Sequence, residues 1–85
     1  MNTAEENLLK AIDEAFVKLS KLGILMIEIR PSEAAQIARA TAHLAKARNS
    51  VQAGDEMDAT TELVNAYTVY PCTLYKDING FGREV

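Results

Sequence analysis

The sequence predicts a small, mostly α-helical domain built from three helices. Apolar residues recur at spacings of three and four along most of the 85 residues, which is the period of an α-helix with one buried face. Helix-start and helix-stop residues divide this pattern into three segments. A chain of this length buries a modest core, so we expect one domain covering residues 1–85.

The first helix is predicted at residues 3–22. Thr3 and Glu6 have the spacing of a capping box, in which both side chains satisfy backbone amides at a helix start. Leucine, isoleucine, alanine and phenylalanine then follow at helical spacing up to Leu22. Gly23 is the expected residue just beyond the helix end, where a left-handed backbone is common.

Residues 24–29, "ILMIEI", are predicted as a short strand. The segment is rich in β-branched residues and lies between Gly23 and the Arg30-Pro31 pair, which favours a strand over a helix. It is expected to pair with residues 72–78, approximately, as a small two-stranded sheet. The alternative for residues 71–85 is an extended or partly ordered segment, since glycine and proline interrupt it repeatedly.

The second helix is predicted at residues 32–53. Pro31 disfavours helix at Arg30, and Ser32 is a good N-cap residue. Its many alanines favour helix and allow a neighbouring helix to approach closely. The side chains expected on its inner face are Ile37, Ala38, Thr41, Leu44, Ala45, Arg48 and Val51.

The third helix is predicted at residues 55–70. Asp55 is the expected N-cap, and Glu56 and Asp58 in the first turn complement the helix dipole. Pro71 ends the helix. Because little more than Gly54 separates this helix from the second, the two are expected to form a tight antiparallel hairpin.

Composition narrows the classes of partner. Nine basic and twelve acidic residues give a formal charge of −3, without a basic tail, so nucleic acid is a less favoured partner than protein. One cysteine excludes an internal disulfide. The N-terminus lacks the basic and apolar pattern of a secretory signal, and the run "ILMI" is too short to span a membrane. We therefore expect a cytoplasmic protein that does not insert into membranes.

The sequence contains no recognisable catalytic, metal-binding or cofactor-binding set. One histidine, His43, and one cysteine, Cys72, are too few for a zinc site, and nothing brings them together as a nucleophile and base. The acidic residues at the start of the third helix are explained by capping and the helix dipole. We expect a protein without enzymatic activity.

Two groups of residues are candidates for binding a partner. Gln36, Arg39, His43, Lys46 and Ser50 follow one another at helical spacing and form a basic and polar stripe, hereafter the basic stripe. Aromatic residues gather near the C-terminus, and tyrosine is frequent in interface anchors. The partner-binding residues predicted from these two groups are Arg39, His43, Lys46, Tyr67, Tyr70, Tyr75 and Phe81.

The function predicted from these observations is that of an interaction module, an adaptor or inhibitor that binds a partner protein. Its small core and alanine-rich helices also predict a homodimer. An accessory protein of a phage or other mobile element is one form that such a module would take. The alternative is a nucleic-acid-associated regulator that uses the basic stripe.

Overall fold

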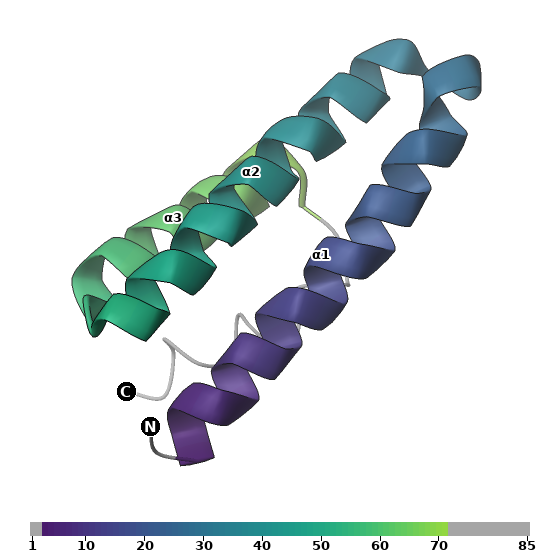
Figure 1. Ribbon diagram of the computed structural model, residues 1–85. Helices are drawn as coiled ribbons and strands as arrows, with labels where there is room; N and C mark the ends of the chain where they lie inside the picture. The colour runs from purple at the N-terminus through teal and green to yellow at the C-terminus, as the bar shows by residue number, and fades with distance from the viewer. Residues whose placement is uncertain (1–2, 72–85) are drawn as a thin grey trace.

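The computed structural model describes residues 3–71, which form three α-helices (Figure 1). Helix α1 runs from Thr3 to Ile29, α2 from Pro31 to Ala53 and α3 from Glu56 to Val69. The central helix α2 packs against both of the others. The predicted three-helix arrangement and the close pairing of the second and third helices are therefore confirmed.

The predicted strand at residues 24–29 is wrong, because α1 continues through this segment. Within residues 3–71 the structure contains no strand. Leu22 and Met26 extend the apolar spacing of Leu19 and pack against the core, so tertiary contact supports helix where local propensity favours a strand. The proposed partner strand at residues 72–78 lies outside the described residues.

Gly23 lies inside α1 and does not terminate it as predicted. A Cβ atom at this position would lie 3.1 Å from Cγ2 of Ile37 on α2, closer than side chains ordinarily approach. The glycine therefore allows α1 and α2 to pack tightly at this level, and its weak helix propensity is overcome by that packing.

A single non-helical residue, Arg30, separates α1 from α2. Its backbone is extended, with φ −142° and ψ 83°, the conformation imposed on a residue that precedes proline. Its N–H donates to the carbonyl of Met26, and its carbonyl accepts from the N–H of Ala34. Arg30 thus closes one helix and opens the next, which turns the chain back on itself.

The core follows a heptad-like spacing on all three helices. On α1 and α2 successive buried positions are separated by three or four residues, and on α3 Ala59 and Ala66 are buried with the half-buried Leu63 between them. Such spacing is typical of helices that pack nearly parallel or antiparallel. The buried apolar residues are Leu8, Ile12, Ala15, Leu19, Ile37, Ala40, Leu44, Ala47, Val51, Ala59 and Ala66.

The buried face of α2 differs from the predicted inner face. Ile37, Leu44 and Val51 are buried as expected, but Ala38 and Ala45 are exposed. The buried alanines are instead Ala40 and Ala47, and Ser50 is buried beside them; Thr41 and Arg48 are half-buried. The prediction assumed one neighbour, whereas α2 packs between two helices and its buried sector extends toward α3.

The turn between α2 and α3 has the chemistry that the sequence predicts. Gly54 has φ 83°, a left-handed conformation that ends α2. The carboxylate of Asp55 accepts a hydrogen bond from the backbone N–H of Asp58 at 3.0 Å and caps α3. The predictions for residues 72–85 fall outside the described part of the chain.

Candidate interaction surfaces

The basic stripe lies on the side of α2 that faces α3, and two of its members contact that helix. Nδ1 of His43 lies 2.6 Å from Oε1 of Glu62, and both side chains are largely buried. The hydroxyl of Ser50 donates to Oδ2 of Asp58. The sequence predicts the stripe as a surface for a partner, but these contacts use part of it to hold the α2–α3 hairpin together.

Arg39 and Lys46 are the exposed cations of the basic stripe. Two carboxylates, Glu62 and Asp58, lie on the α3 side of the same stripe because they bind His43 and Ser50. Nearby negative charge lowers the positive potential that a phosphate backbone would meet. These carboxylates therefore make the basic stripe less favourable for binding a phosphate backbone.

Tyr67 and Tyr70, the two predicted anchors in the described part of the chain, differ in exposure: Tyr67 is exposed and Tyr70 is half-buried. The hydroxyl of Tyr70 donates to Oε2 of Glu33 at 2.6 Å and ties the end of α3 to the start of α2. Tyr67 is exposed on the outer side of α3. Tyr75 and Phe81 lie outside the described residues, so the proposed C-terminal aromatic surface stays a prediction.

The outer side of α3 is an uncharged surface. Met57, Val64 and Tyr67 are exposed there, and three threonines share the same side of the helix. Each threonine hydroxyl donates to the backbone carbonyl four residues earlier, which satisfies the hydroxyl within the helix. These threonines are Thr60, Thr61 and Thr68.

The end of α1 carries the most concentrated exposed apolar surface among the described residues, hereafter the apolar tip. Four aliphatic side chains form it, and each is well over half exposed. They are Ile24 (68% exposed), Leu25 (65%), Ile27 (59%) and Ile29 (68%). Sequence reasoning missed this surface because the segment was assigned to a sheet with one buried face. The run of aliphatic residues was itself the available signal.

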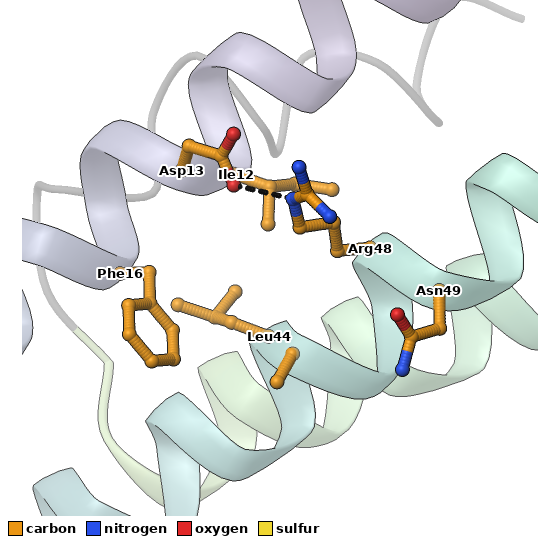
Figure 2. A pocket seen from close by; sticks show the side chains of 7 residues that line it. Ile12, Asp13, Phe16, Leu44, Arg48 and Asn49 are labelled. Atoms are coloured by element: carbon orange, nitrogen blue, oxygen red, sulfur yellow. Dashed lines mark hydrogen bonds and ion pairs between the residues drawn. The ribbon is translucent and has the colours of Figure 1, made fainter.

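A groove of about 400 Å³ lies between α1 and α2. Figure 2 shows Ile12 and Phe16 on α1 close to Leu44 on α2, with α3 behind α2. Nε of Arg48 donates to Oδ1 of Asp13 at 2.8 Å across this groove. Both charged side chains are about half exposed, so the ion pair contributes at most about 1 kcal/mol to stability.

Other types of site were sought in the described residues. No three histidine, cysteine or acidic side chains within residues 3–71 are grouped so that they would hold a metal ion. No helix in that range has both the length and the apolar character needed to cross a membrane. Comparison with protein-family models, curated proteins and solved structures finds no match to this chain.

Proposed function

We propose that this protein acts by binding another protein through its apolar tip, as an adaptor or an inhibitor does. The observation that supports the proposal is the exposure of Ile24, Leu25, Ile27 and Ile29 within two turns of one helix. A helix that is apolar on all sides is normally buried, and soluble monomers rarely leave such a cluster in water. A bound partner would remove it from water.

The energy available at the tip is sufficient for a specific contact. Each of the four side chains has roughly two-thirds of its surface exposed, so its burial stabilises a complex by about 1–2 kcal/mol before the costs of association. Glu28 and Arg30 are also exposed at this end of the molecule. Apolar anchors with charged residues at the rim are typical of protein interfaces.

The shape of the tip favours a concave partner. A helix end with projecting aliphatic side chains fits an apolar groove, which is a common mode of helix recognition. A nucleic acid partner is less well supported, because the cations Arg39 and Lys46 stand beside the carboxylates that bind His43 and Ser50. The proposed binding requires no catalytic residue.

The proposal is tested with the double variant Leu25→Lys/Ile29→Lys. Both positions are exposed, so the helix should form while the apolar surface is replaced by charge. Val64→Lys, at an exposed apolar position on α3, is the matched control. The tagged proteins are used for capture from cells that naturally produce the chain, with mass spectrometry of what is retained.

We expect one protein to be captured by the wild type and by Val64→Lys, and lost with the double variant. Calorimetry with that purified protein should then show binding weakened at least about tenfold, which corresponds to about 1.4 kcal/mol. Equal capture by the double variant, or no enriched protein at all, would reject the proposal.

A further inference from the structure

The residues of the apolar tip point to two different sides of α1. Each residue turns a helix by about 100°, so Ile27 lies nearly opposite Leu25 and Ile29, while Ile24 lies on the same side as Ile27. A single flat surface therefore leaves part of the tip in water. Ile27 belongs to a side of α1 that a second surface would cover.

The side that carries Ile27 continues into a longer surface, hereafter the α1–α2 face. It is the side of the α1–α2 pair that carries the groove, away from α3 (Figure 2). Exposed or half-buried residues from both helices form it. From α1 these are Phe16, Ser20 and Ile27, and from α2 they are Ala34, Ala38 and Ala45.

Bulky and small side chains stand beside each other on this face. The close approach of Gly23 to Ile37 and the ion pair between Asp13 and Arg48 fix the antiparallel register of the two helices. In that register Ile27 is level with Ala34, and Phe16 is level with Ala45. Phe16 and Ala45 also line the two sides of the groove. The α1 half of the face is therefore raised at Phe16 and Ile27, and the α2 half is low at its three alanines, with Arg48 and Asn49 beside Ala45.

We propose that the partner on the α1–α2 face is a second copy of this chain. A two-fold axis parallel to the helices places α1 of each copy over α2 of the other at the same level. The partner's Ile27 then rests on Ala34 and Ala38, and the partner's Phe16 rests on Ala45 at the edge of the groove. The raised half of one copy then packs on the low half of the other, and the reverse contact is identical, as a two-fold interface requires.

The charges of the face favour a second copy. The chain carries a net charge of −3, which opposes association of two copies in general. On this side of the molecule, however, Asp13 and Arg48 neutralise each other, and the six residues that form the face are uncharged. Two such faces meet without like-charge repulsion at their centre.

The long side of the molecule that carries the α1–α2 face is large enough for a dimer. The molecule measures 41 × 20 × 18 Å, so one of its long sides offers on the order of 800 Å², which is the area per partner in a standard protein interface. This inference goes beyond the proposed function, and the α1–α2 face shares only Ile27 with the apolar tip. The dimer covers Ile27 and leaves Leu25 and Ile29 available to the other partner.

The test of association is sedimentation equilibrium of the full chain with two variants of α2. Ala38→Glu places a charge in the centre of the proposed interface, and Gln36→Glu adds the same charge at an exposed position on another side of that helix. We expect a dimer for the wild type and for Gln36→Glu. The dissociation constant of Ala38→Glu should rise about 100-fold, since each copy then buries an unpaired carboxylate against the partner's Ile27.

Circular dichroism must show that Ala38→Glu keeps its helical content, and the exposure of Ala38 makes this the expected result. A monomeric wild type, or equal dimerisation of the wild type and Ala38→Glu, would overturn the inference. A monomer that still captures another protein through Leu25 and Ile29 would leave the proposed function standing and remove only the dimer.

The orientation is tested by disulfide cross-linking in a Cys72→Ser background. A chain with Ile27→Cys and a chain with Ala34→Cys are mixed and oxidised, and mixed disulfide dimers are expected. If Ile27→Cys instead cross-links to Asp13→Cys, near the other end of α1, then α1 of one copy lies antiparallel on α1 of the other and the parallel arrangement is wrong.

Discussion

Asp55 has its role determined by its nearest neighbours in the chain. Its carboxylate accepts the backbone N–H of Asp58, and Gly54 before it has the left-handed backbone that ends α2. Both features depend on atoms within three residues, so the sequence alone predicts them.

Replacing Asp55 by alanine should lower the free energy of unfolding by about 1 kcal/mol, because the N–H of Asp58 loses its intramolecular partner. Urea denaturation followed by circular dichroism measures the change. Glu56→Ala, at the exposed neighbouring position, is the control and should alter stability by less than about 0.5 kcal/mol. A smaller loss for Asp55→Ala than for Glu56→Ala would contradict the capping role.

His43 shows the opposite case at the scale of one residue. Its place in the basic stripe predicts a partner-binding residue, yet it contacts Glu62, which is 19 positions away in sequence. Neither residue type nor spacing identifies that partner, because the contact depends on how α2 and α3 pack. The same holds for Tyr70 and Glu33, which are 37 positions apart.

At the scale of elements, α1 depends on a close approach that its own sequence disfavours. Gly23 weakens a helix locally, but it leaves room for Ile37, which is almost completely buried. The helix therefore continues to Ile29 because α2 packs against it.

Gly23→Leu tests this packing, because leucine favours helix and any loss must come from crowding against α2. We expect a loss of about 1–3 kcal/mol in the free energy of unfolding, as is usual for overpacked cores. Lys21→Leu, at an exposed position of the same helix, should change stability by less than about 0.5 kcal/mol. If Gly23→Leu proves as stable as the wild type, the close contact with Ile37 does not hold.

At the scale of the whole molecule, the three helices of residues 3–71 share a core in which eleven apolar residues of that range are buried, five of them alanines. Alanine contributes little apolar area, so additional burial in the proposed dimer would add a sizeable fraction of the total stability. Folding and association would then be coupled, and stability would depend on protein concentration.

The melting temperature of the wild type should therefore rise with concentration, by about 4 °C for each tenfold increase if folding and dimerisation occur together. Ala38→Glu should melt at a temperature that does not change with concentration. Differential scanning calorimetry over two decades of concentration measures both. A wild type whose melting temperature stays constant would show that folded chains do not associate over this range of concentration.

The sequence by itself determined three helices, the hairpin between the second and third, and the Gly54-Asp55 turn. These depend on periodicity and on local backbone chemistry, which are set by neighbours within one or two turns. It also placed Ile37, Leu44 and Val51 correctly in the core.

Only the tertiary structure decided that residues 24–29 are helical, which side of α2 is buried and where apolar surface remains exposed. A run such as "ILMIEI" is compatible with both strand and helix, and packing of Leu22 and Met26 on the core selects the helix. The candidate surfaces followed from that choice. Had the segment formed a strand, Leu25, Ile27 and Ile29 would share one face, because alternate side chains along a strand lie on the same side. In the helix, Ile27 lies nearly opposite the other two.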